Sequence, residues 1–140
     1  MKWYRKASEQ GNADAQCNLG IAYASGQGVE QDEAEAVLWW RKAAEQEHAY
    51  AQFQLGFAYA NGRGVEQDEA EAVKWWRKAA AQEHADAQFQ LGLMHVVGRG
   101  VEQDEAEAVK WFSKSAEQGL AEAQFQLGLM HANGIGVEQD

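Results

Sequence analysis

The sequence contains no proline and no threonine, and it has one cysteine among 140 residues. Without proline, no residue forces a break in a helix interior, and without threonine the strand-forming residues are few. The helix-favouring residues Ala, Glu, Gln, Lys and Leu are abundant instead. A single cysteine excludes an internal disulfide framework and a multi-cysteine metal site. We therefore expect an all-α protein.

Long apolar runs and positive charges are also scarce. No run approaches the roughly 18 apolar residues of a membrane span, and the first ten residues, MKWYRKASEQ, lack the apolar segment of a signal peptide. The 12 Lys and Arg residues are outnumbered by 22 Asp and Glu residues, which gives a net charge of −10. Nucleic-acid binding depends on cations that neutralise phosphates, so we expect no nucleic-acid partner. The chain is expected to be soluble, and the sequence leaves its compartment open because a longer parent could be exported.

What the sequence does contain is a repeat with a period of 36 residues. The segment GVEQDEAEAV occurs at 28–37, 64–73 and 100–109, and GVEQD occurs again at 136–140. Periods of 20 to 50 residues are typical of solenoids and propellers. We expect a single repeat domain over residues 1–140, with its parts at 1–12 (second helix only), 13–48, 49–84, 85–120 (full repeats) and 121–140 (first helix and hinge).

The first half of each unit has the pattern of a helix that ends at glycine. In the second unit, apolar residues recur at three- and four-residue spacing, which predicts a helix over about 48–61. Gly62 follows directly, and glycine is the usual residue at the left-handed position after a helix. Gly64 permits a second unusual backbone conformation. The glycine pair therefore predicts a hinge between two helices.

The second half of each unit has the signals of a helix start. Asp68 is a candidate N-cap, and Glu71 three residues later completes a capping box, in which each side chain accepts from an amide of the other residue. The second helix is expected over about 68–82. The acidic residues are its first turn, so the segment is not expected to bind a nucleotide phosphate or calcium.

These residues carry a family resemblance. The pattern A-x-A-Q-x-x-L-G-x-x-Y-x-x-G-x-G-V-x-x-D-x-x-x-A-x-x-W-x-x-K-A-A over 49–80 resembles the Sel1-like repeat, a 36-residue relative of the tetratricopeptide repeat. The resemblance implies a right-handed α/α superhelix of helix-turn-helix repeats, which we expect to contain about seven helices. First helices would line its concave side. It further implies an adaptor for other proteins, as found in bacterial signalling and host contact.

The chain departs from the family pattern at the end of the second helices. The usual glycine is present at Gly11 and Gly119 but is replaced by Glu47 and Glu83. If the backbone stays left-handed there, each glutamate strains its turn by about 1 kcal/mol. The paired cysteines of some exported relatives are also missing, so no disulfide is expected.

Differences between the units indicate where a partner binds. Residues 98–111 repeat residues 62–75 without change, whereas the first helices vary. An apolar groove on the concave side is typical of a partner-binding surface. The predicted groove residues are Tyr50, Phe53, Phe57, Asn61, Asp86, Phe89, Leu93, Val96, Val97, Phe125, Leu129 and Asn133. Packing between successive units is the favoured alternative for the three phenylalanines Phe53, Phe89 and Phe125.

For the residues that could take part in catalysis or metal binding, the sequence favours structural roles. The six tryptophans recur with the repeat, which is typical of core packing. The four histidines form two pairs at equivalent repeat positions, too far apart for a shared zinc ion. Cys17 occupies a helix-interior position and no serine lies in a nucleophile motif. We expect no catalytic residue, no metal and no cofactor, and thus no enzyme.

The predicted function is a scaffold that binds a protein or peptide partner on the concave face. The alternative is a structural segment that self-associates head to tail through its uncapped ends. Asp140 is in register with Asp104 and Met1 with Val109, so a second copy could continue the array. Partner identity and source are left open by the sequence.

Overall fold

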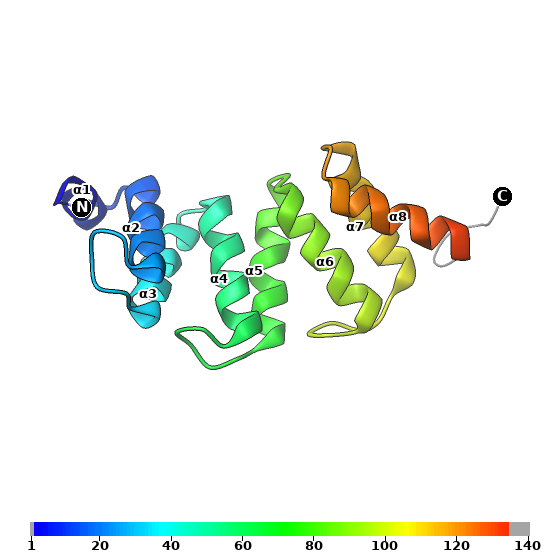
Figure 1. Ribbon diagram of the computed structural model, residues 1–140, viewed down its shortest axis with the longest axis horizontal. Coiled ribbons are helices and arrows are strands. Elements are labelled where there is room, and N and C mark those ends of the chain that lie inside the picture. Colours follow the sequence, from blue (N-terminus) through cyan, green and yellow to red (C-terminus); the bar gives the residue numbers. More distant parts are fainter. Residues whose placement is uncertain (1, 135–140) are drawn as a thin grey trace.

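The computed structural model describes residues 2–134, which form eight α-helices and no strand. Figure 1 shows the helices following one another along the long axis, from α1 at one end to α8 at the other. The all-α repeat fold is confirmed. The expected number of seven helices was wrong, because three pairs and one helix in each partial repeat make eight. The helices are α1 (Lys2–Glu9), α2 (Ala13–Ser25), α3 (Glu33–Glu45), α4 (Ala49–Asn61), α5 (Glu69–Ala81), α6 (Ala85–Val97), α7 (Glu105–Glu117) and α8 (Ala121–Asn133).

Packing joins each helix to the next one in the chain. The main contacts within units are α2 with α3, α4 with α5 and α6 with α7, and those between units are α3 with α4, α5 with α6 and α7 with α8. One unit cannot bury its apolar side alone, so its core is completed by its neighbours. Met1 and the last hinge copy at 136–140 lie outside the described residues.

The hinge between first and second helix is also a contact between units. Gly62 ends α4 in the left-handed conformation, with φ of 65°, and its N–H donates to the carbonyl of Ala58. Gly64 has φ of 79°, and a Cβ there would lie 2.3 Å from the carbonyl oxygen of Glu33, in the first turn of α3. Only glycine fits this position, which explains why a glycine recurs here in each hinge.

Each complete second helix begins at an aspartate N-cap, as predicted. The side chain of Asp68 accepts a hydrogen bond from the N–H of Glu71 at 3.1 Å. The reciprocal half of the predicted capping box does not form, because the N–H of Asp68 donates to the carbonyl of Tyr59 at 2.9 Å. The carboxylate of Glu71 instead pairs with Lys74 at 3.6 Å. The hinge is thus tied back to the end of the first helix.

The two glutamates that replace glycine after second helices adopt the left-handed conformation. Glu47 has φ of 67° and Glu83 has φ of 65°. These are backbone angles at which a side chain is unfavourable by about 1–2 kcal/mol. Each carboxylate accepts from a buried glutamine, Gln52 or Gln88, at 3.5 Å. The predicted strain is therefore present and is partly offset by a local contact.

Buried glutamines connect successive units in a way that the sequence analysis missed. The Nε2 of Gln52 donates to the carbonyl of Ala44 at 3.1 Å, on the preceding second helix. Its Oε1 accepts from Nε2 of Gln82 at 2.9 Å, after the following second helix. The same pair of bonds recurs at Gln16 and Gln88. In α2, α4 and α6, one glutamine amide therefore bonds both to the preceding second helix and to the residue that follows the next second helix.

In α2, α4 and α6, an aromatic ring of the following second helix lies against the glycine of the first helix. A Cβ at Gly20 would lie 2.6 Å from Trp40, and one at Gly56 would lie 2.4 Å from Trp76. The third unit repeats this arrangement with other residues. At Gly128 in α8 there is nothing within 4 Å of the added Cβ. In α2, α4 and α6 this glycine therefore provides the space for the aromatic residue of the following second helix.

The prediction that the tryptophans pack in the core holds for most of them. Trp39 and Trp75 are 7% and 5% exposed, and Trp75 packs into the apolar cluster of the preceding unit. Trp3 occupies the same repeat position but is 76% exposed. For Trp3 the prediction was wrong, because no unit precedes α1 in the described part of the chain. Burial at this position depends on the neighbour.

Candidate functional site

The twelve predicted groove residues lie on α4, α6 and α8, and we call them the first-helix face. Phe53 is buried in the core at 9% exposure, so packing is its role. Four more are partly buried against core clusters: Phe57, Phe89, Leu93 and Val96. Seven are exposed: Tyr50, Asn61, Asp86, Val97, Phe125, Leu129 and Asn133.

An aromatic cluster forms the centre of this face. The ring centroids of Phe53 and Phe57 are 4.8 Å apart, and those of Phe57 and Trp76 are 5.3 Å apart, both edge to face. Tyr50 lies 6.2 Å from Phe53 and contacts the ring of His84 at the same distance. Edge-to-face pairs of this kind fix ring positions. The exposed ring of Tyr50 therefore packs on side chains whose positions are fixed by their own ring contacts.

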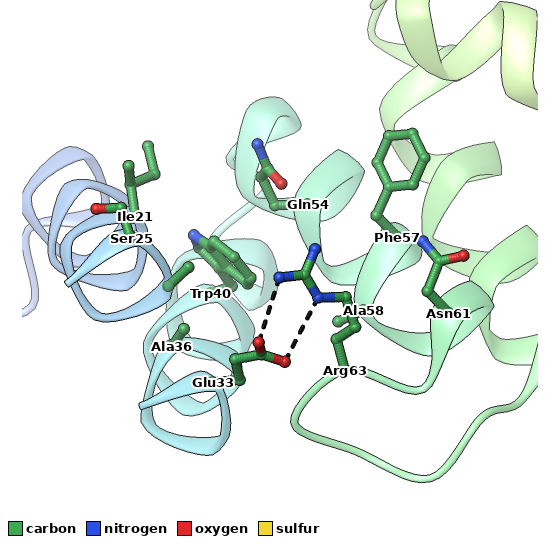
Figure 2. A pocket seen from close by; sticks show the side chains of 11 residues that line it. Ile21, Ser25, Glu33, Ala36, Trp40, Gln54, Phe57, Ala58, Asn61 and Arg63 are labelled. Atoms are coloured by element: carbon green, nitrogen blue, oxygen red, sulfur yellow. Dashed lines mark hydrogen bonds and ion pairs between the residues drawn. The ribbon is translucent and has the colours of Figure 1, made fainter. Parts of the chain in front are cut away.

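A hollow of about 510 Å³ opens beside this cluster, between the first two full units. Its apolar floor and its polar rim come from α2, α3, α4 and the hinge after α4 (Figure 2). The volume lies within the roughly 300–1,000 Å³ that ligand pockets occupy. Its main lining residues are Ile21, Ala36, Trp40, Phe57 and Ala58 on the floor and Ser25, Glu33, Gln54, Asn61 and Arg63 at the rim.

Small side chains account for this hollow. Ile21 and Ala58 line it, and one repeat further along the chain Phe57 and Met94 stand at the equivalent positions. Both of these larger residues pack against the core cluster of the second and third units. Sequence differences between the first helices therefore change the shape of the surface from one pair of units to the next.

An ion pair spans one edge of the hollow. Figure 2 shows Arg63 reaching from the hinge to Glu33 at the start of α3. The guanidinium donates from Nε and Nη2 to the two carboxylate oxygens at 3.4 and 3.2 Å. Arg99 and Glu69 form the same pair one unit later. These arginines are therefore neutralised within the array.

The first helices carry acidic residues and no cationic ones. Neither Lys nor Arg occurs in α2, α4, α6 or α8, whereas Asp14, Asp86 and Glu122 occupy one repeat position in three of them. Asp14 accepts from Nε2 of His48 at 2.8 Å. The exposed side of these helices is therefore a surface of negative charge.

Two histidines act as helix N-caps, which the sequence analysis did not anticipate. Nδ1 of His48 accepts from the N–H of Ala51, and Nδ1 of His84 accepts from that of Ala87, both at 3.2 Å. Asn12 caps α2 at the same repeat position. Asn, Asp, Ser and Thr are the usual caps, so a histidine gave no signal. Burial lowers the pKa of His84, and nearby Asp86 raises it in part.

The remaining candidates for chemistry are structural. Cys17 is buried, and desolvation with the charge of Asp14 raises the pKa of its thiol to about 12. Residues 2–134 contain no group of three or more His, Cys, Asp or Glu side chains that could hold a metal ion. Among the described helices, none has both the length and the apolar character needed to cross a membrane.

The comparisons with known proteins agree with this architecture. The Sel1 repeat family model matches at residues 1–12, 13–48, 49–84, 85–120 and 121–140. The chain belongs to the Sel1 repeat family. Sel1 repeat proteins generally act as protein-interaction scaffolds. None of the curated proteins matches the chain.

Solved structures of Sel1 repeat proteins share the fold. A protective antigen of uropathogenic Escherichia coli with an SLR fold is 45% identical, with a TM-score of 0.97 over 99% of this chain and 30% of that one. A Sel1 repeat protein from Oxalobacter formigenes is 43% identical, with a TM-score of 0.90 over 94% of this chain and 54% of that one. The cysteine rich protein B of Helicobacter pylori is 27% identical, with a TM-score of 0.72 over 90% and 96%. The chain thus spans about a third and a half of the first two relatives.

Proposed function

We propose that this Sel1 repeat chain is a non-catalytic scaffold that holds a protein or peptide partner on the first-helix face. The proposal is carried by the hollow of about 510 Å³, together with exposed apolar side chains elsewhere on the first helices such as Tyr50 and Val97. Concave, mostly apolar surfaces with a few polar groups are typical of binding sites. The buried thiol of Cys17, with its raised pKa, supports a role without nucleophilic catalysis.

A selection of peptides displayed on phage against the purified chain tests this proposal. The affinity of a selected peptide is then measured for the wild type and for the double variant Tyr50→Ser with Val97→Ser. We expect binding to weaken roughly tenfold or more, because exposed aromatic anchors dominate such contacts. Leu38→Ser is the matched control, since Leu38 is exposed on the second helix α3. Equal losses in both variants, or none in either, contradict the assignment of the face.

Head-to-tail self-association is the second candidate function. Its support is that Trp3 is exposed where Trp39 and Trp75 are buried, and that the space above Gly128 is open. Within the array, the tryptophan position packs on the preceding unit, and the glycine position seats the aromatic ring of the second helix of its own unit. Sedimentation velocity over a wide concentration range tests it. A mass that rises with concentration and returns to the monomer in Trp3→Ser supports it, and a constant monomer mass contradicts it.

A further inference from the structure

The charges of this chain are divided between its two kinds of helix. Ten of the twelve Lys and Arg residues lie in the second helices α1, α3, α5 and α7. The other two, Arg63 and Arg99, lie in hinges, and each pairs with a glutamate. The helices α2, α4, α6 and α8 therefore offer a partner carboxylates and no Lys or Arg of their own.

The second-helix cations that contact an aromatic ring divide into two groups. The guanidinium groups of Arg5 and Arg41 lie 5.9 and 5.6 Å from the ring centroids of tyrosines on the first helices α2 and α4. Lysines of α3, α5 and α7 lie against tryptophans of their own helices. The ammonium of Lys42 lies 4.4 Å from the ring centroid of Trp39. Lys74 and Lys78 lie 5.4 and 5.2 Å from that of Trp75. Such cation–π contacts favour these positions over extended ones that would reach across the molecule. Among the described residues, no Lys or Arg of a second helix forms an ion pair with a carboxylate of a first helix.

Carboxylates on the first helices are accessible to a partner. Asp14 is 87% exposed in its side chain, although it accepts one hydrogen bond from His48. Asp86 occupies the equivalent position on α6, is exposed, and forms no ion pair among residues 2–134. Surface potential of one sign attracts partners of the opposite sign and raises their rate of association.

The hollow supplies the apolar part of the recognition. Its floor of Ile21, Trp40 and Ala58 has room for an aliphatic or aromatic side chain. On the rim, the amide of Asn61 makes no hydrogen bond within the described residues, and Gln54 uses only its Nε2, which donates to the hydroxyl of Tyr50 at 2.7 Å. Amides of this kind can bond to the backbone of an extended peptide.

We infer that the partner segment is a cationic peptide that inserts one apolar side chain into the hollow between α2, α3 and α4 and directs Lys or Arg residues toward the carboxylates of the first helices. The inference rests on the proposed function and adds the chemistry of the partner. The carboxylates of Asp14 and Asp86 would repel an acidic peptide.

Two labelled peptides of about twelve residues test the inference. Both contain the same leucines and serines, and they differ in having lysines or glutamates at the remaining positions. Binding is followed by fluorescence anisotropy at low and high salt. We expect the lysine peptide to bind roughly tenfold or more tightly than the glutamate peptide at low salt, with the difference shrinking as salt screens the charges.

Substitutions that copy residues from another repeat of the chain test where the peptide binds. Ile21→Phe with Ala58→Met fills the hollow with the residues of the next unit, and we expect roughly tenfold weaker binding of the lysine peptide. Ala58→Met alone serves if the double variant has lost helical circular dichroism. Asp14→Asn with Asp86→Asn is expected to weaken binding several-fold at low salt only. Glu45→Gln with Glu117→Gln, on exposed second-helix positions, removes the same charge and is expected to have little effect.

The outcomes separate this inference from the proposed function. Equal or tighter binding of the glutamate peptide overturns the inference, as does lysine-peptide binding that survives filling of the hollow or responds equally to both charge variants. Absence of binding by either peptide also overturns it. In each case the phage selection still decides whether the first-helix face binds peptides of another chemistry.

Discussion

Gly56 lies directly against the indole of Trp76, and a Cβ on Gly56 would sit 2.4 Å from Nε1 of that ring. The indole is 1% exposed and donates from Nε1 to the carbonyl of Phe53 at 3.1 Å, so it has no room to retreat. The contact sets how closely the two helices of a unit approach. The indole on the second helix therefore requires a residue without a Cβ at the facing position of the first helix.

Replacing Gly56 by Ala is expected to destabilise the fold by up to about 2 kcal/mol. Overpacking of a core costs about 1–3 kcal/mol, and the better helix propensity of Ala returns about 1 kcal/mol. Urea unfolding followed by circular dichroism measures the change. Gly128→Ala is the control, because open space surrounds that position and only the propensity gain remains. A stabilised Gly56→Ala variant contradicts the packing described here.

The substitution Glu83→Gly is expected to raise the free energy of unfolding by about 0.5–1 kcal/mol. The residue has φ of 65°, where a side chain costs about 1–2 kcal/mol. Part of the gain is lost with the contact to Gln88 and through the freer unfolded chain of glycine. The mirror change, Gly119→Ala at the equivalent position, has nothing within 4 Å to clash with and is expected to destabilise by about 1 kcal/mol. Changes of the same sign in both variants would contradict this account.

The ends of the helices in each repeat could be predicted from local signals in the sequence. Gly62 and Asp68 act within one turn of the chain, so their backbone roles could be predicted from residue type and spacing. Exposure on the first-helix face could not be predicted in this way. Phe53 and Phe125 share a repeat position, yet they are 9% and 66% exposed. In an array, burial depends on what the next unit places over a residue, and one unit's sequence does not contain that information.

The polar connections between units were missed for a related reason. From the sequence of its own helix, Gln52 would be predicted to lie on the surface, because a single repeat offers its amide no partner. The structure gives it a carbonyl from the unit before and an amide from the segment after. Buried polar groups are bonded as a rule, so a glutamine at a constant repeat position is a signal for such a link.

Breaking one of these links tests their contribution. Gln88→Leu leaves the carbonyl of Ala80 and the side chain of Gln118 without their buried partner. We expect a loss of about 1–3 kcal/mol in the free energy of unfolding, measured in urea. Gln90→Leu on the same helix is the control, since Gln90 is partly exposed, and its effect is expected to stay within about 0.5 kcal/mol. Equal stabilities for the two variants would show that the glutamine link is not a stabilising contact.

His84 makes the stability of the array depend on pH. Its Nδ1 accepts from the N–H of Ala87, so this nitrogen must carry no proton for α6 to keep its cap. Desolvation of the ring, which contacts Tyr50 and Phe53, lowers its pKa from the ordinary 6.5, and the charge of Asp86 opposes the shift without reversing it.

The sign of the dependence follows from that shift. The unfolded chain binds the proton at a higher pH than the folded chain, so His84 contributes stability above about 6.5 that is lost as the pH falls below that value. His84→Asn is expected to remove this contribution, since Asn12 caps α2 at the same repeat position. The measurement is the difference between the urea stabilities of the two proteins from neutral pH to about pH 5, which cancels the titration of the other groups. A difference that does not change with pH, or an NMR titration of His84 above its ordinary range, would contradict the cap as the pH-sensitive element.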